Sequence, residues 1–345
     1  MRVGLVYDPV YLEHDTGNHV ENAQRLIATM SLFEETELKD KLVLLSPRQA
    51  TVDELSTVHA TEYISRIQSQ AERGGGRLDA DTVTSSSSYE AAICAAGGAI
   101  TAVESVLNNR VQSAFAMVRP PGHHATCWQA MGFCLFNNVA IAAKYALANF
   151  DLDRVLIVDF DVHHGNGTQD SFYADPHILY FSTHQYPLYP GTGSINETGT
   201  REGEGFTVNV PLIAGCGDGE YQAVFEDLLA PVAKRFQPQL ILVSAGYDAH
   251  WLDDISSMQV SISGFARLVQ ILQTIANLFC NGRLVLALEG GYHLQALSLS
   301  IKATLDTLLG ATEIDDPLGR RETQVMSSSI DDFIRMIKDV HQLET

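Results

Sequence analysis

Short apolar runs that lack polar alternation recur along this chain, and they limit its fold more than any other feature. Such runs of Val, Ile and Leu are typical of parallel strands covered on both faces, because a half-exposed strand alternates apolar and polar residues. Helical patterns lie between the runs, at 89–107, 137–149, 219–235 and 263–280. Alternating strands and helices predict an α/β fold with a central, mostly parallel sheet. The runs occupy residues 2–7, 113–118, 154–160, 177–183, 239–246 and 283–291.

The organisation of the chain indicates one domain. Its 345 residues exceed the usual ~100–200 per domain, but a single large α/β domain can reach this length. No repeat and no linker rich in Pro and Ser divides the sequence, so we expect a single domain over residues 1–345. The segment 73–88 is the most loop-like, and an amphipathic stretch near 329–341 predicts a terminal helix.

The composition excludes several classes of protein. Hydrophobic residues make up 46% of the chain and charged residues 19%, which supplies a sizeable core and argues against global disorder. The formal net charge is −20, from 42 acidic and 22 basic residues. This balance argues against direct nucleic acid binding through a broad basic face, and it favours the attraction of cationic substrates.

The cysteines and the first residues predict a soluble, cytoplasmic protein. The five cysteines form no C-x-x-C pair, so we expect a reducing compartment rather than a disulfide framework or a structural zinc knuckle. The opening stretch lacks the apolar region of a signal peptide, and no uncharged apolar run is long enough to cross a membrane. The sequence does not decide the oligomeric state.

Polar side chains follow four of the apolar runs. Parallel sheets bind ligands beyond the carboxyl ends of their strands, so the residues that follow each run test the predicted sheet. We expect these side chains to meet at one edge of the sheet. They are His123, His124, Asp159, Asp161, His163, Asp248, His250, Tyr292 and His293.

The run that ends in Asp159 predicts a metal site. Asp159, Asp161 and His163 would point the same way in extended backbone, and grouped buried carboxylates need a compensating cation. Asp161, His163 and Asp248 offer one nitrogen and two carboxylates and leave a position for water, as catalytic zinc sites do. The alternative for an isolated Asp-x-His pattern is an ion pair or a strand-end cap, but four converging strand ends favour a metal.

We expect one Zn²⁺ per chain, and the sequence does not distinguish it from Fe²⁺. Binuclear manganese hydrolases of the arginase type use Asp-x-His-x-Asp to help hold a second ion. Here Gly165 takes the place of the last aspartate, which indicates a single metal.

The tandem histidines are candidates for acid–base catalysis. His123 and His124 follow the stiff turn at 120–122, which can fix their direction. Histidine can take a proton from water and return it to a leaving amine near neutral pH. Asp159 and Asn166 are the plausible acceptors for the other ring nitrogens. The alternative is a tandem histidine packed in a turn.

Tyr292 is a candidate oxyanion donor. It follows two glycines, which permit unusual backbone angles. Its phenol could donate a hydrogen bond to a substrate carbonyl and stabilise the developing oxyanion. The alternative is a tyrosine that plugs the edge of the sheet.

These residues lie in segments that resemble the zinc-dependent histone deacetylase family, including its bacterial and plastid members. The resemblance spans nearly the whole chain in order. At Asn166 the sequence resembles the class II branch of the family, because class I members carry Asp at this position. It implies the arginase–deacetylase fold, with about eight strands flanked by helices, and hydrolysis of an N-acetyl amide. The matching segments are "GLVYDPVYLEHD", "VRPPGHHA", "GFCLFNNVAIAA", "VDFDVHHGNGTQ", "YPGTG", "LILVSAGYDAH" and "LALEGGYHL".

The resemblance also implies a role for each matching residue. His124 is the general base and then acid, His123 paired with Asp159 is its electrostatic partner, and Tyr292 activates the carbonyl. The implied zinc ligands are Asp161, His163 and Asp248. The implied substrate tunnel has Phe133 and Tyr189 as aromatic walls, Gly132 and Gly291 as small walls, and Ile255 near its entrance. The implied structural K⁺ sites involve Asp159, Asp161, His163, Ser182 and Thr183, and, for a second ion, Phe172.

The chain departs from the family at positions that bear on the substrate. His19-Val20-Glu21 replaces His-Pro-Glu, and His293 stands where Asn commonly follows the tyrosine. Acetylpolyamine-selective relatives carry a glutamate gatekeeper near the position of Ile255. Ile255 argues against such a gatekeeper here, but the neighbouring Asp253 and Asp254 could still attract a polyamine.

Two classes of function therefore remain. The first is a zinc-dependent amidohydrolase that removes acetyl or acyl groups from N-acetyl-lysine or related amines, with an acetylpolyamine amidohydrolase as the alternative. The second is a non-catalytic acyl-lysine-binding subunit. The presence of every proposed catalytic group favours the enzyme.

Overall fold

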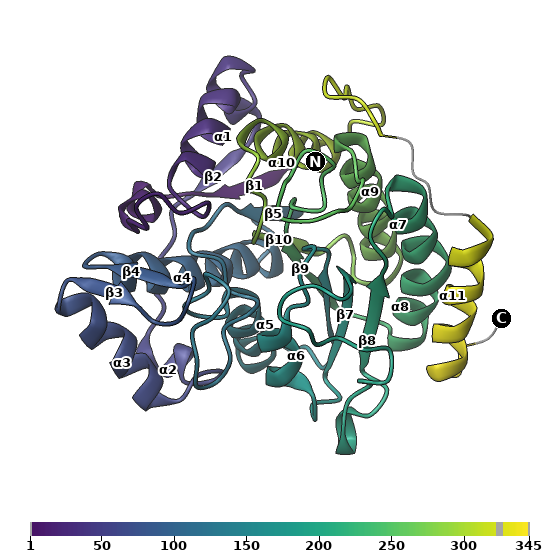
Figure 1. Ribbon diagram of the computed structural model, residues 1–345, viewed down its shortest axis with the longest axis horizontal. Coiled ribbons are helices and arrows are strands. Elements are labelled where there is room, and N and C mark those ends of the chain that lie inside the picture. The colour runs from purple at the N-terminus through teal and green to yellow at the C-terminus, as the bar shows by residue number, and fades with distance from the viewer. Residues whose placement is uncertain (1, 322–326, 344–345) are drawn as a thin grey trace.

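A parallel sheet forms the centre of the molecule (Figure 1). The structure is a computed structural model that describes residues 2–321 and 327–343. All pairings within the main sheet are parallel, as expected. Its eight strands lie in the order β2 (Val43–Leu45), β1 (Val3–Val6), β5 (Ser113–Ala116), β10 (Leu284–Leu288), β9 (Leu240–Ala245), β6 (Val155–Asp159), β7 (Ile178–Gln185) and β8 (Thr207–Leu212).

The predicted apolar runs all form strands of this sheet, and the two strands that the sequence analysis missed are its edges. β2 has only three residues, which is too short to stand out as a run. β8 reads "TVNVPL", where Asn209 and Pro211 interrupt the apolar pattern. Proline cannot donate to a strand ladder and is confined mainly to edges, so this sequence suits an edge strand.

Helices cover both faces of the sheet. α4 (Ser88–Leu107) and α5 (Asn138–Asn149) pack on one face, and α9 (Ile262–Phe279) and α10 (Leu294–Leu309) pack on the other (Figure 1). α1 (Gln24–Glu35) lies against α10, while α7 (Asp218–Val224) and α8 (Ala230–Phe236) lie against α9. The remaining helices are α2 (Val52–Leu55), α3 (Thr61–Glu72), α6 (Asn166–Phe172), α11 (Ser327–Val340) and three short 3₁₀ helices, at Pro9–Glu13, Lys39–Lys41 and Arg201–Gly203.

Side-chain caps set where several helices begin. Asn137 accepts a hydrogen bond from the Ala140 N–H at the start of α5, and Ser261 does the same for Gly264 at the start of α9. The His293 ring accepts from the Ala296 N–H, so this departure from the family pattern caps α10. α10 ends at Gly310 in the left-handed conformation, with φ of 107°.

Two predicted segments differ in detail from the structure. The loop-like stretch 73–88 contains an antiparallel hairpin of β3 (Gly75–Arg77) and β4 (Val83–Ser85). The predicted helix at 219–235 is divided, because a π-helical turn at Phe225–Leu229 separates α7 from α8. Pro231 lies at the start of α8 and has no N–H to donate to the preceding turn. The predicted terminal helix is α11, whereas residues 322–326 of the polar tail lie outside the described residues.

α4 is a core helix. By length and hydropathy α4 could cross a membrane, but Glu90 and Glu104 lie within it, so it is not the uncharged apolar run that we expected to be absent. In its 18-residue apolar window, 78% is buried inside the protein. Its small residues allow close packing. A Cβ atom at Gly97 would lie 1.9 Å from the carbonyl oxygen of Arg48, so the helix contacts the backbone of the loop beside it.

We therefore expect Gly97→Ala to destabilise the protein by about 1–3 kcal/mol through overpacking against backbone. Gly219→Ala is the matched control, because nothing lies within 4 Å of its Cβ position in α7. The control should be neutral or stabilise by about 0.5–1 kcal/mol, since alanine favours a helix more than glycine. Urea unfolding measures both free energies, and equal effects of the two variants would contradict the packing described for α4.

Candidate active site

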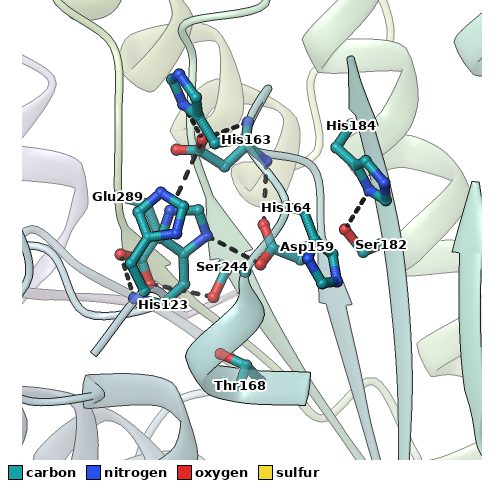
Figure 2. Close-up of polar contacts among 12 residues, drawn as sticks. His123, Asp159, His163, His164, Thr168, Ser182, His184, Ser244 and Glu289 are labelled. Atoms are coloured by element: carbon teal, nitrogen blue, oxygen red, sulfur yellow. Dashed lines mark hydrogen bonds and ion pairs between the residues drawn. The ribbon is translucent and has the colours of Figure 1, made fainter. Parts of the chain in front are cut away.

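Four neighbouring strands at the centre of the sheet carry the predicted site residues. β5, β10, β9 and β6 are consecutive in the sheet, and the polar residues identified in the sequence follow each of them. Because the strands are parallel, their carboxyl ends meet at one edge. Figure 2 shows the resulting group of buried histidine and carboxylate side chains.

Three of the predicted residues form a possible metal-binding group. One potential ligand atom each from Asp161, His163 and Asp248 lies within 4.8 Å of the other two, and all three residues are buried. His163 Nδ1 is 3.0 Å from Asp161 Oδ1 and 3.2 Å from Asp248 Oδ2. Two carboxylates and one imidazole would neutralise a divalent ion and match the ligand types of catalytic zinc sites.

The surroundings of the two carboxylates fit a bound cation. A Cβ atom at Gly246 would lie 2.0 Å from Asp161 Oδ2, and one at Gly290 would lie 2.2 Å from Asp248 Oδ2. Only glycine leaves room for the carboxylates at these positions. Asp248 Oδ1 accepts from the Val162 N–H, whereas the buried Asp248 Oδ2 is paired only with the His163 ring nitrogen among the described residues. A buried carboxylate oxygen with so little compensation is costly, and a metal ion would stabilise it.

The electrostatics of this group show why a cation would stabilise it. Burial, followed by the charge of Asp161, raises the pKa of Asp248 to about 6. Burial opposes the charge of His163, yet hydrogen bonds to Asp161 and Asp248 raise its pKa to about 10. Without a metal, a proton on His163 partly compensates the two carboxylates; a divalent ion would take over that role.

The backbone of this segment differs from the expected extended form. β6 ends at Asp159, and residues 161–163 form a bend. The side chains still gather, because the Asp161 N–H donates to Asp159 Oδ1 and the His163 N–H donates to Asp161 Oδ1. Local side-chain hydrogen bonds therefore replace the strand geometry as the cause of the cluster.

Each tandem histidine has its own acceptor. His123 Nδ1 lies 3.1 Å from Asp159 Oδ2, and His124 Nδ1 lies 2.8 Å from Asn166 Oδ1. The two rings are tilted with centroids 4.0 Å apart, and the His124 ring is 5.9 Å from that of His163. His123 and His124 are both buried, so their rings are shielded from bulk water.

The surroundings of the two histidines shift their pKa values in opposite directions. Burial opposes the charge of His123, but Asp159 and then Asp161 raise its pKa to about 10. Burial, followed by the charges of His123 and His163, holds the pKa of His124 well below its usual value. At neutral pH the pair therefore comprises a protonated His123 and an unprotonated His124.

Tyr292 lies in the loop after β10. Its backbone N–H donates to Asp253 Oδ2 at 2.6 Å, and the Arg25 guanidinium lies 5.0 Å from its ring centroid. Burial, with the charge of Asp248, raises the pKa of Tyr292 well above its usual value. The phenol therefore keeps its proton and can act as a hydrogen-bond donor.

The predicted tunnel residues adjoin the catalytic group to different degrees. The Tyr189 ring lies 5.1 Å from that of His124, and the Phe133 ring lies 5.8 Å from that of Tyr292. A Cβ atom at Gly132 would lie 2.3 Å from His124 Cδ2 and 3.0 Å from Tyr189 Cε1, so only glycine suits this wall.

The other two predicted tunnel residues, Gly291 and Ile255, have different neighbours. Gly291 has φ of 114°, and its Cβ position faces Leu297 and Tyr247. Ile255 is half-buried, and its N–H donates to Asp253 Oδ1. The other oxygen of that carboxylate accepts from the Tyr292 N–H. Asp253 is buried and accepts the Tyr292 and His293 N–H groups, whereas Asp254 is exposed. Attraction of a polyamine by these aspartates stays a prediction.

The residues predicted to hold potassium fall into two places. Asp159 on β6 is the register neighbour of Ser182 on β7, and the Thr183 hydroxyl donates to the Asp159 carbonyl. Ser182 Oγ lies 2.9 Å from His184 Nδ1 (Figure 2). Phe172 is separate from these residues, at the end of α6, where the Lys144 ammonium lies 5.1 Å from its ring centroid. Potassium binding stays a prediction.

Sequence reasoning missed Glu289, which holds the histidine turn in place. This buried residue follows β10, and its Oε2 accepts the N–H groups of Gly122 and His123 at 2.6 and 3.2 Å. Its Oε1 accepts from the Ser244 hydroxyl (Figure 2). A carboxylate directly after a predicted strand, on the same edge as the other site residues, was the available signal.

Arg25 was also missed. Its guanidinium donates to the carbonyls of Glu289 and Gly291 and pairs with Glu21, so it anchors the loop that carries Tyr292. Nothing in the local sequence pattern of α1 marks this contact, which joins residues 266 positions apart.

Comparisons with known proteins agree with the fold and identify the family. A family model described as "Histone deacetylase domain" matches residues 19–308. A "Probable deacetylase" of Archaeoglobus fulgidus is 42% identical and covers 86% of this chain and 82% of its own. "Histone deacetylase 14, chloroplastic" of Arabidopsis thaliana is 39% identical, over 96% and 83%.

Two further comparisons bear on structure and substrate. "Polyamine deacetylase HDAC10" of Homo sapiens is 41% identical and covers 84% of this chain and 45% of its own. The "Crystal Structure of HDA15 HD domain" superposes with a TM-score of 0.90 at 33% identity, over 99% of this chain and 94% of that one.

The fold and site thus define an α/β hydrolytic enzyme of the arginase–deacetylase superfamily. Within it, this chain belongs to the histone deacetylase family and is a deacetylase. The predicted family and fold class are confirmed.

If Asp161, His163 and Asp248 hold the metal, Asp161→Asn and Asp248→Asn should each weaken zinc binding at least about a hundredfold, because even outer-shell partners typically contribute 10–100-fold. Competition with a chromophoric chelator measures the affinity. Asp151→Asn, at an exposed position after α5, is the matched control and should bind zinc like the wild type. Wild-type affinity in both ligand variants, with native circular dichroism, would contradict the site.

Proposed function

We propose that this protein is a zinc-dependent amidohydrolase that removes acetyl groups from acylated lysine side chains or related amines. The observation that carries this proposal is a pair of buried histidines, each with its own acceptor, beside the buried group of Asp161, His163 and Asp248. Amide hydrolysis needs a base for water and an acid for the amine, and this arrangement supplies both near neutral pH.

The donor set fits one divalent ion, held by Asp161, His163 and Asp248. When bound, such an ion polarises a carbonyl oxygen and lowers the pKa of water, and zinc suits the nitrogen and oxygen ligands. Asp159 is adjacent to the ligands but is engaged by His123 and by the Tyr180 hydroxyl, so it serves His123 rather than the ion.

His124 is the proposed base. Its Nδ1 faces Asn166, which leaves Nε2 to take a proton from the attacking water. Asparagine carries no charge, so it orients the ring without stabilising the imidazolium as a carboxylate would. The depressed pKa of His124 keeps the base unprotonated before reaction and makes its conjugate acid ready to protonate the departing amine.

His123 and Tyr292 have supporting roles in this proposal. The protonated His123, paired with Asp159, places a fixed positive charge beside the reacting group. The Tyr292 phenol keeps its proton and can donate to the acyl oxygen as negative charge develops there. Asp253 and Arg25 position the tyrosine through contacts with its N–H and its ring, respectively.

The substrate is proposed to carry a positive charge. Burial, followed by the charge of Asp81 and smaller contributions from Cys134 and Asp79, raises the pKa of Tyr189 above its usual value. Both carboxylates therefore lie near this wall of the proposed tunnel. Cationic chains such as lysine-rich peptides or polyamines suit that charge and the net charge of −20. The polyamine deacetylase among the relatives favours an acetylpolyamine as the second candidate substrate.

We also propose an intracellular setting and structural potassium. All five cysteines are free, and four of them are buried, which suits a reducing compartment. Potassium near Asp159, Ser182 and Thr183 would add positive charge beneath the site. No basic surface for nucleic acid is part of this proposal.

His124→Ala should lower kcat for deacetylation by roughly 10²–10⁴, the usual contribution of a general base. Tyr292→Phe should lower it by roughly 10²–10³, as loss of an oxyanion donor does. Both variants should fold and bind zinc. The matched controls are His177→Ala, just before β7, and Tyr173→Phe, just after α6. Near-wild-type turnover is expected for both. Wild-type rates in His124→Ala would refute the assignment of the base.

Asp79→Asn and Asp81→Asn should test the preference for charge. Each should lower kcat/KM for N-acetylspermidine several-fold at low salt and have less effect on a neutral acetyl-lysine peptide, with the difference shrinking at 1 M salt as charges are screened. A parallel assay of N-acetylputrescine and acetyl-lysine peptides ranks the substrates. Equal losses for charged and neutral substrates would show that these carboxylates do not select charge.

A further inference from the structure

A cavity of about 600 Å³ lies near the amino ends of β6, β7 and β8, whereas the proposed catalytic residues follow the carboxyl ends of strands. Its walls come from the residues just before β6, β7 and β8 and from the ends of α8 and α11, which lie at the same side of the molecule (Figure 1). Apolar side chains form much of the lining, including Leu179, Phe206 and Phe236. The volume is in the usual range for small-molecule sites.

A histidine with no partner lines this cavity. His341 follows α11 and is 5% exposed, yet neither of its ring nitrogens has a hydrogen-bond partner among the described residues. Buried polar atoms are normally paired, so two free nitrogens on one buried ring mark a place where a bound molecule would be stabilised. A neutral imidazole there offers one donor and one acceptor.

Two arginines flank the histidine. Arg154 donates to the carbonyl of Gln237, and Arg235 donates to the carbonyl of His341, so both are fixed by backbone contacts. Neither guanidinium has a carboxylate within ion-pair distance in the part of the chain that the structure describes, although the protein carries 42 acidic residues. Their charges are therefore available to a ligand.

One carboxylate, Glu204, also lines the cavity, where it accepts a hydrogen bond from the Thr198 hydroxyl. Burial, then the charge of Arg235, lowers the pKa of His341 to about 4, and Glu204 opposes that effect only in part. The electrostatic balance around the histidine is therefore positive. An anion would relieve it.

We propose that this cavity binds a small organic anion with an apolar body. The arginines would hold the carboxylate or phosphate, His341 would donate to it, and the apolar walls would enclose the remainder. This inference is independent of the proposed deacetylation, because none of the lining residues belongs to the catalytic group.

Isothermal titration of the full-length, zinc-loaded protein tests the proposal, with phenylacetate and phenyl phosphate as probes and neutral phenylacetamide as their control. Saturable binding is expected for at least one anion and not for the amide, and the stronger anion identifies the head group. Arg154→Gln and Arg235→Gln should each weaken the anion at least about tenfold, as loss of a charged hydrogen bond does.

Two matched variants locate the binding. Arg110→Gln removes an exposed arginine after α4 and should leave the affinity unchanged, as should Tyr292→Phe in the catalytic group. Circular dichroism and thermal unfolding establish that each variant is folded. The proposal is overturned if neither anion binds, if phenylacetamide binds equally well, if both cavity variants bind like the wild type, or if Tyr292→Phe abolishes binding.

Discussion

The attraction between buried carboxylates and positive charge is the interaction on which this site depends. Asp161 and Asp248 lie side by side in the interior, together with a histidine whose ring nitrogen faces both. Two anions cannot share such a place without compensation. Backbone amides of Val162 and Gly290 supply part of it, and glycines leave the space that the carboxylates occupy. Because negative charge remains, we propose that this group holds a divalent cation.

The order of the strands explains why these groups meet. The four strands that carry site residues are far apart in sequence yet consecutive in the sheet. Buried contacts then lock their loops together: Glu289, at the end of β10, holds the histidine turn that follows β5, and Arg25 from α1 holds the tyrosine loop. The catalytic geometry is thus supported by the same interior that stabilises the fold. Such support is needed, since proton transfer requires its partners within hydrogen-bond reach.

Much of the fold could be predicted because burial on both faces leaves a simple signature, the unbroken apolar run. Where that signature is absent, as in β2 with three residues and β8 with Asn209 and Pro211, prediction failed. The convergence of Asp161, His163 and Asp248 was predictable because these residues follow strand ends. The pairing of each histidine with its own acceptor was left open by the residues alone, and Glu289, Arg25 and Asp253 act through long-range contacts to backbone groups, which no local pattern encodes.

The central claim is that one cation is bound between two carboxylates and an imidazole at the carboxyl edge of β6 and β9. Anomalous X-ray diffraction from zinc-loaded crystals, recorded above and below the zinc absorption edge, tests it most directly. We predict one strong difference peak per chain within coordination distance of Asp161, His163 and Asp248, at roughly 2.0–2.2 Å from each ligand atom. A zinc-replete, active crystal with no peak among these three residues, or with its peak elsewhere, would contradict the account.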